Sequence, residues 1–147
     1  FKDNLNRENA LLKVKQNWNN ITQKLSVKTP SESINLLING WLIYQTLSSR
    51  LYGKTGFYQS GGAYGFRDQL QDSLGMKFVD SKLLEEQIIN CASHQFIEGD
   101  VLHWWHNETK RGIRTRFSDD LLWLAYAVLE YIEFTNNKSI LETFSLT

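Results

Sequence analysis

The sequence predicts an all-α fold. Four segments repeat apolar residues at spacings of three and four, which is the period of a helix that buries one face. The glycine-rich and aromatic segments between them lack this period, and no segment shows the alternation typical of a strand. Hydrophobic residues make up 41% of the 147 residues, which is ordinary for a packed globular chain.

The first two helices are expected in the N-terminal third of the chain. Residues 8–25 carry a single apolar stripe, which predicts a surface helix. The members of the stripe are Leu11, Val14, Trp18, Ile21 and Leu25. The only proline then lies in Thr29-Pro30-Ser31-Glu32, which matches a capping box with proline at the first helical position. A second helix is therefore expected from there to about Leu51, with a broader apolar face and deeper burial.

Two further helices are expected in the second half. Residues 80–96 form the third, with Asp80 or Ser81 as its cap and Leu84, Ile88 and Cys91 among its inward side chains. The fourth begins at Ser118-Asp119-Asp120, whose acids lie at the positive end of the helix dipole. Because residues 121–129 are apolar nearly all round, this helix is expected to be packed on several sides. A break at residues 135–137 precedes a last short helix.

The densest functional signal runs from Gly56 to Asp72. Five of the nine glycines lie between Gly53 and Gly65, so this backbone makes tight turns or passes close to something. Asp68 and Asp72 follow at i, i+4 spacing on one helix face, with Arg67 beside them. A planar fork donor next to paired carboxylates is suited to binding the hydroxyls of a sugar. The alternative is a structural salt bridge at the helix start, between Arg67 and one of the two acids.

A second candidate segment covers residues 97–117, where the helical period disappears. A connection of this length inside a compact helical domain is usually functional. His103 and His106 are three residues apart, but no third ligand is spaced to complete a metal site, so no metal is expected. Trp104 and Trp105 would face opposite sides of an extended chain. We therefore expect one of them in the core and the other in an acceptor site.

Composition excludes several classes of function. The formal net charge is zero and there is no basic footprint, so no nucleic-acid partner is expected. The longest apolar run, residues 121–129, is too short to cross a bilayer, so no membrane contact is expected. The single cysteine, Cys91, fits a reducing, cytoplasmic compartment. The aromatic content of 13% suits carbohydrate binding as well as a core. Because the chain begins at Phe1 and Met76 is its only methionine, we expect a piece of a longer protein.

Three long motifs occur in a fixed order: GFRDQLQD at residues 65–72, EGDVLHWWH at 98–106 and RTRFSDDLLWL at 114–124. Together they resemble glycoside hydrolase family 94, the inverting disaccharide and oligosaccharide phosphorylases, and they look most like its β-1,2-glucan branch. The resemblance covers nearly the whole chain. It implies an (α/α)6 barrel, with residues 1–28 as a connecting helix and residues 29–147 as the first part of the barrel.

The resemblance also implies a substrate and a set of contacts. The substrates would be a β-linked glucan oligosaccharide and inorganic phosphate, with no cofactor. Arg67, Asp68 and Asp72 would hold the glucosyl unit, with Arg67 also near phosphate. The family's general acid lies in a Trp-Asn-Asp motif that this sequence lacks, so no catalytic acid is expected in this chain. The full set of expected substrate contacts is Gln59, Arg67, Asp68, Asp72, His103, Trp104, Arg116, Asp119 and Asp120.

Several readings stay open beside this one. Asp119 and Asp120 are equally well explained as helix caps, and Trp123 and Tyr126 are most simply core residues. The alternatives to a β-1,2-glucan phosphorylase are a hydrolase or another disaccharide phosphorylase on a similar barrel, and a non-catalytic carbohydrate-binding fragment. A homodimer is a candidate state of the parent protein.

Overall fold

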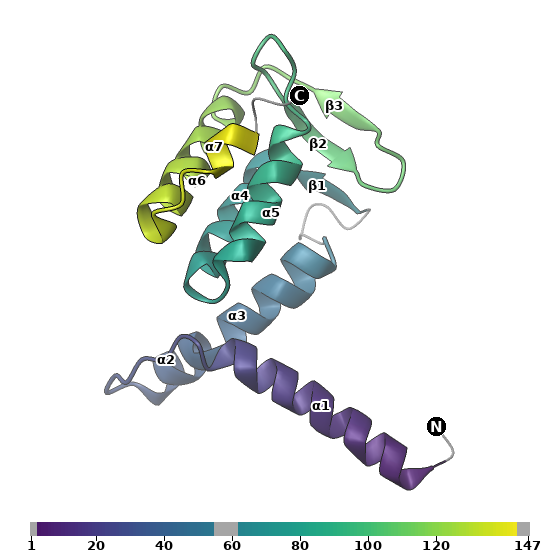
Figure 1. Cartoon of the computed structure of the whole chain (residues 1–147), viewed down its shortest axis with the longest axis vertical. Helices are drawn as coiled ribbons and strands as arrows, with labels where there is room; N and C mark the ends of the chain where they lie inside the picture. Colours follow the sequence, from purple (N-terminus) through teal and green to yellow (C-terminus); the bar gives the residue numbers. More distant parts are fainter. Residues whose placement is uncertain (1–2, 55–61, 144–147) are drawn as a thin grey trace. The chain divides into compact units, whose positions relative to one another are not determined.

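The computed structural model describes residues 3–54 and 62–143, so the predicted site residue Gln59 lies outside the described residues (Figure 1). The described residues are mostly helical, as the sequence predicts, with one small sheet. The chain divides into two compact units, residues 1–45 and 46–147. Among the described helices, none combines the length and the apolarity needed to cross a bilayer.

The first unit begins with α1 (Asn4–Thr22), which starts four residues before the predicted range. Asp3 caps the helix, because its carboxylate accepts a hydrogen bond from the backbone N–H of Leu5 at 3.0 Å. No α1 side chain is buried, so the expectation of a surface helix is confirmed.

A kinked helical segment follows in the same unit: α2 (Glu32–Leu36), η1 (Leu37–Trp41) and α3 (Leu42–Gln45). The kink lies at Asn39 and Gly40, whose backbone angles are not helical. The Asn39 amide there both accepts from and donates to the backbone of Val27, at 2.7 and 2.9 Å. The side chain of Asn39 thus holds the preceding loop against the bend.

The expected capping box is wrong in its position. Ser31, not Thr29, is the N-cap of α2, and its hydroxyl accepts from the backbone N–H of Ile34 at 3.4 Å. Thr29 is engaged elsewhere, because its backbone N–H and its hydroxyl both bond to the side-chain oxygen of Asn35. Pro30 therefore precedes the helix instead of opening it.

The described residues of the second unit form six helical segments and three strands. These are η2 (Thr46–Tyr52), β1 (Ala63–Gly65), α4 (Phe66–Leu74), η3 (Gly75–Phe78), α5 (Ser81–Ala92), β2 (Leu102–His106), β3 (Gly112–Arg114), α6 (Asp120–Thr135) and α7 (Ile140–Thr143). Asp80 caps α5 as predicted, by accepting from the backbone N–H of Lys82 at 3.1 Å. Asn136 ends α6 in the left-handed conformation, at the break that the sequence predicts.

The core of this unit lies among α4, α5 and α6, which all contact one another, and one side of the sheet (Figure 1). The predicted inward residues of α5 are confirmed, because Leu84, Ile88 and Cys91 are fully buried. Trp105 of β2 is 1% exposed and meets Phe66 of α4 edge to face at 6.4 Å between ring centres. This contact joins strand β2 and the start of α4 to the same hydrophobic core.

The sheet corrects the expectation that the chain has no strands. It is antiparallel with order β1-β2-β3, and it pairs Tyr64 with Trp105 and Trp104 with Ile113. Strands of three to five residues are too short to show a period of two. The aromatic residues of β2 also face both sides, which removes the contrast between apolar and polar positions.

The expectation that α6 is packed on several sides is wrong for this chain. Leu122 and Leu129 are 69% and 65% exposed, while Ala127, Val128 and Tyr131 face the core. Trp123 packs against the core as expected, but Tyr126 is 47% exposed and is not a core residue. Apolar side chains thus remain exposed on α6, and others remain exposed on α2 and α3.

Candidate functional site

The first turn of α4 presents Arg67 and Asp68. Phe66 and Leu70 are spaced i, i+4 and are fully buried, so the packing of α4 turns the intervening Arg67 outward. Gly65 occupies the N-cap position and pairs with Trp104 in the sheet. The motif at residues 65–72 thus places a charged turn at the edge of the sheet, next to a rigid core.

Arg67 is joined to the start of α6 and not to the acids of its own helix. Its Nη1 donates to Oδ2 of Asp119 at 2.8 Å, across 52 positions of sequence. The two side chains are 47% and 44% exposed, so neither group is sequestered by this contact. The alternative of a salt bridge from Arg67 to Asp68 or Asp72 is therefore wrong. The pair brings together the motifs at 65–72 and 114–124.

His103 and Asp120 form a second pair at the same helix start. Nδ1 of His103 lies 2.6 Å from Oδ2 of Asp120. The Asp120 side chain is 4% exposed and the His103 side chain 32% exposed, so the acid is inside and the ring is partly outside. The ring also stacks on Phe117, with 4.5 Å between ring centres and 16° between planes. The capping expectation is corrected too, because neither Asp119 nor Asp120 makes a side-chain cap for α6.

Asp72 belongs to a separate cluster. Its Oδ2 accepts from Nε of Arg50 at 2.5 Å and from the hydroxyl of Tyr64 at 3.0 Å. Burial, followed by the nearby Asp72 charge, raises the pKa of Tyr64 above its usual range. Burial alone would lower the pKa of Arg50, but the hydrogen bond and charge of Asp72 outweigh it and raise that pKa. Both residues therefore keep their protons.

Asp68 shares a face with Asp72, as its spacing predicts, and its charge acts on Arg50 and Tyr64. In the part of the chain that the structure describes, no hydrogen bond or ion pair engages the Asp68 carboxylate. Of the two predicted acids of α4, Asp68 is thus the one whose oxygens have no protein partner there.

The other predicted contacts lie apart from these pairs. Trp104 is partly exposed and meets His106 edge to face at 5.6 Å, whereas Trp105 is buried, which confirms that one of the two lies in the core. Arg116 is exposed, and its charge acts on Asp100. Within the described ranges, no three His, Cys, Asp or Glu side chains are grouped as metal ligands.

Three residues of these clusters were missed from the sequence as site residues: Arg50, Tyr64 and Phe117. Arg50 lies at the end of a helix and Tyr64 within the glycine-rich stretch, so neither position shows a local pattern that names Asp72 as its partner. Phe117 is part of the third motif, and its position before the two acids is the only signal that sequence alone offers.

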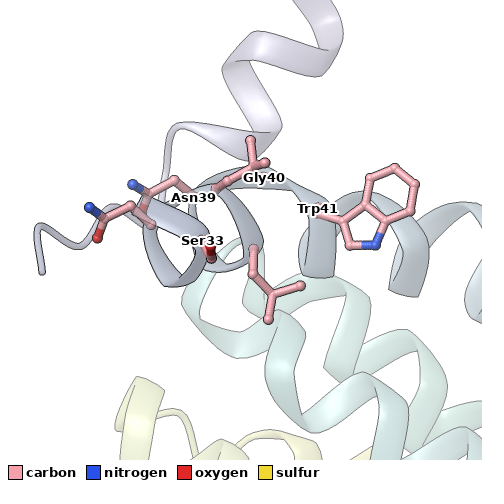
Figure 2. A pocket seen from close by; sticks show the side chains of 7 residues that line it. Ser33, Asn39, Gly40 and Trp41 are labelled. Atoms are coloured by element: carbon pink, nitrogen blue, oxygen red, sulfur yellow. The ribbon is translucent and has the colours of Figure 1, made fainter. Parts of the chain in front are cut away.

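A cavity lies elsewhere among the described residues, in the first unit. It is open, has a volume of about 800 Å³, and surrounds the kink at Asn39 and Gly40 (Figure 2). Figure 2 shows Ser33 and Asn39 beside the kink and the side chain of Trp41 to one side of them. No titratable side chain lines the cavity, so it offers shape and amide groups but no acid, base or charge. We therefore place the chemistry at the starts of α4 and α6.

The fold and this cluster define a class: part of a helical domain that gathers arginine, histidine and carboxylates at helix starts, an arrangement suited to polar ligands rich in hydroxyls. The sequence profile of the "Glycosyl hydrolase 94 superfamily, catalytic domain" matches residues 17–145. The chain therefore belongs to this superfamily.

Several characterised relatives are similar to the chain. It is 46% identical over 133 residues to cyclic beta-(1,2)-glucan synthase NdvB of Rhizobium meliloti. This match covers 90% of the chain and 5% of the length of that protein. It is 24% identical over 170 residues to N,N'-diacetylchitobiose phosphorylase of Vibrio proteolyticus, a match that covers 97% of the chain and 21% of that protein. Solabiose phosphorylase of Paenibacillus borealis is 27% identical to the chain over 126 residues, a match that covers 83% of the chain and 15% of that protein. The chain thus spans a small part of each relative.

Proposed function

We propose that the complete protein containing this chain cleaves β-1,2-linked glucan with inorganic phosphate. Inversion at a β linkage would give α-glucose 1-phosphate. The observation that carries this proposal is the meeting of Arg67, Asp119, His103 and Asp120 at one helix start, in a chain 46% identical to a protein named as a cyclic beta-(1,2)-glucan synthase.

The proposed reaction divides its needs between two kinds of group. An inverting hydrolase requires one carboxylic acid for the leaving oxygen and one base to activate water. Phosphate is already a nucleophile, so a phosphorylase needs cationic donors where that base would act. Arg67 offers an exposed guanidinium for this purpose, and the carboxylate of Asp68 can accept hydrogen bonds from glucosyl hydroxyls.

The proposal assigns no proton donor to these 147 residues. The Trp-Asn-Asp motif is absent, and Trp18-Asn19-Asn20 lies in α1, in the first unit. We therefore predict that the chain alone releases no product from sophorose or a longer β-1,2-glucan, with or without phosphate. Turnover by the purified chain that disappears in an Arg67→Ala variant would contradict this prediction.

The experiment that tests the proposal measures phosphate dependence in the complete protein. Incubation with β-1,2-glucan and phosphate is expected to give α-glucose 1-phosphate, identified by the anomeric signal in NMR. Release of free glucose without phosphate would show a hydrolase, and binding without any turnover would show a carbohydrate-binding protein. Parallel assays with N,N'-diacetylchitobiose and solabiose address the substrates in the names of the phosphorylase relatives.

Several finer assignments stay predictions. They are a complete (α/α)6 barrel, the role of residues 1–28 as a connecting helix, a cytoplasmic location, a homodimer and the absence of a cofactor. The barrel is supported by the superfamily match and by the apolar surface of α6.

A further inference from the structure

The two side chains of the His103–Asp120 pair differ in their exposure to solvent. Asp120 is 3% exposed and sits in the first turn of α6, so its carboxylate is not available to a sugar. His103 is on β2 with its side chain 32% exposed, and its ring is the only part of the pair that a ligand can reach. A contact made by this pair must therefore be made by the histidine.

The geometry fixes which nitrogen of the ring is available. An ionised carboxylate only accepts hydrogen bonds, so a neutral His103 holds its proton on Nδ1, which lies 2.6 Å from Asp120. Nε2 then presents a lone pair. Among the residues that the structure describes, none is hydrogen-bonded to Nε2. The stack on Phe117 restricts rotation of the ring, so this lone pair has one direction.

The position of the pair ties it to the rest of the site. Asp119 holds Arg67 and Asp120 holds His103, and consecutive Cα atoms lie about 3.8 Å apart. The start of α6 thus holds a hydrogen-bond donor, the guanidinium of Arg67, and an acceptor, Nε2 of a neutral His103. A sugar hydroxyl both donates and accepts, whereas a phosphate oxygen at neutral pH chiefly accepts. A neutral His103 therefore suits the hydroxyl and leaves phosphate to the arginine.

We propose that Asp120 is a positioning residue that holds His103 so that its Nε2 accepts a hydrogen bond from a hydroxyl of the bound glucan, beside Arg67. The proposal rests on the function proposed above. In this proposal His103 binds the glucan, and phosphate is bound by Arg67 and not by His103. It also explains why one of two neighbouring acids is exposed and the other buried.

The rival explanation is a structural latch between β2 and α6. A buried hydrogen bond of this kind stabilises the fold whether or not the ring touches a ligand. The two roles differ in kinetics. A latch lowers the melting temperature and leaves the folded enzyme with normal constants, whereas a positioned acceptor changes the Michaelis constant for glucan more than that for phosphate.

Three variants of the complete protein test the proposal. His103→Phe keeps a flat ring against Phe117 and removes both nitrogens. Asp120→Asn keeps the size of the acid, but its amide donates as well as accepts and so permits the other tautomer. Asp100→Asn is the matched control, because Asp100 is another carboxylate that is hydrogen-bonded to a side chain, that of Arg114, outside the proposed site.

The expected kinetic result is a fall of about ten- to a hundred-fold in kcat/KM for glucan in His103→Phe and in Asp120→Asn, which is typical when a site loses a hydrogen-bond partner of its substrate. The KM for phosphate should stay within about two-fold, and Asp100→Asn should match the wild type. Unchanged kcat/KM for glucan, or a larger effect on the KM for phosphate, would overturn the proposal.

A spectroscopic measurement tests the positioning step without any turnover. In the complete protein, 15N-histidine labelling reports the tautomer of each neutral ring, and the signal that disappears in His103→Phe is that of His103. The neutral ring is expected to carry its proton on Nδ1 in the wild type and to lose that preference in Asp120→Asn. A proton on Nε2 in the wild type would overturn the assignment. A wild-type protein that cleaves glucan without phosphate would overturn the reaction proposed above, while the comparison of variants would still decide the role of His103.

Discussion

Replacement of Arg67 by lysine separates a substrate-binding role from a structural one. The variant Arg67→Lys keeps the charge but replaces a planar fork with a point charge, and the two are not equivalent where a side chain bridges two acceptors. In the complete protein we expect kcat/KM for phosphate to fall roughly thirty-fold to a thousand-fold. This corresponds to about 2–4 kcal/mol of lost transition-state stabilisation.

The stability that Arg67→Lys would lose in a purely structural role is much smaller than this. The Arg67–Asp119 pair is nearly half exposed on both sides, and pairs of this kind contribute about 0–1 kcal/mol. A loss of that size lowers the melting temperature by at most about 4 °C in a domain of this length. A purely structural arginine would therefore give a small thermal shift and normal kinetics in the folded enzyme.

The chain offers a matched control for this test in Arg114. Its side chain is 43% exposed and pairs with Asp100 at 2.5 and 2.6 Å, so Arg114→Lys makes the same chemical change in a bidentate pair outside the proposed site. The melting temperature and kcat/KM for phosphate should be measured on the same preparation of each variant. If Arg67→Lys and Arg114→Lys both keep wild-type kinetics, Arg67 does not contact substrate or phosphate.

Three further predictions concern the fold. In Gly112→Ala the new methyl group would collide with the carbonyl oxygen of Trp104, so we expect a loss of about 1–3 kcal/mol in the free energy of unfolding, measured with urea. The hydrogen bond from Lys77 holds the pKa of Glu130 below its usual value, so this pair stabilises the fold at neutral pH and stops doing so as the pH falls through the folded pKa. In melting experiments Glu130→Gln should therefore lose less stability on acidification than the wild type, and an equal loss would contradict the assignment. Burial raises the pKa of Cys91 to about 12, so iodoacetamide should modify this thiol only after denaturation.

Local signals predicted the helices well. Asp80 caps α5, and Leu84, Ile88 and Cys91 of that helix are buried as their spacing predicts, because capping and periodicity act within a few residues. The β1–β2–β3 sheet escaped prediction because its strands depend on pairing between distant segments. Their stability comes from partners such as Tyr64 and Trp105, which are far apart in sequence.

The charged pairs of the site were unpredictable for a related reason. Helical spacing correctly placed Asp68 and Asp72 on one face, and both act on Arg50. It could not predict that Arg67 would bind Asp119, because that contact depends on how α4 packs against α6. Sequence motifs identified the segments that meet, whereas tertiary packing decided which side chains are joined.

The two acids of α4 illustrate how pairing separates residues that sequence treats alike. Oδ2 of Asp72 already accepts two hydrogen bonds, from Arg50 and Tyr64, so a sugar hydroxyl at that oxygen would have to displace a charged or a buried donor. Asp68 lies one turn earlier on the same face and has no such competitor among the described residues. For a glucosyl unit bound beside Arg67, Asp68 is therefore the better acceptor of the two, and Asp72 serves it indirectly by fixing the helix and strand from which the site is built.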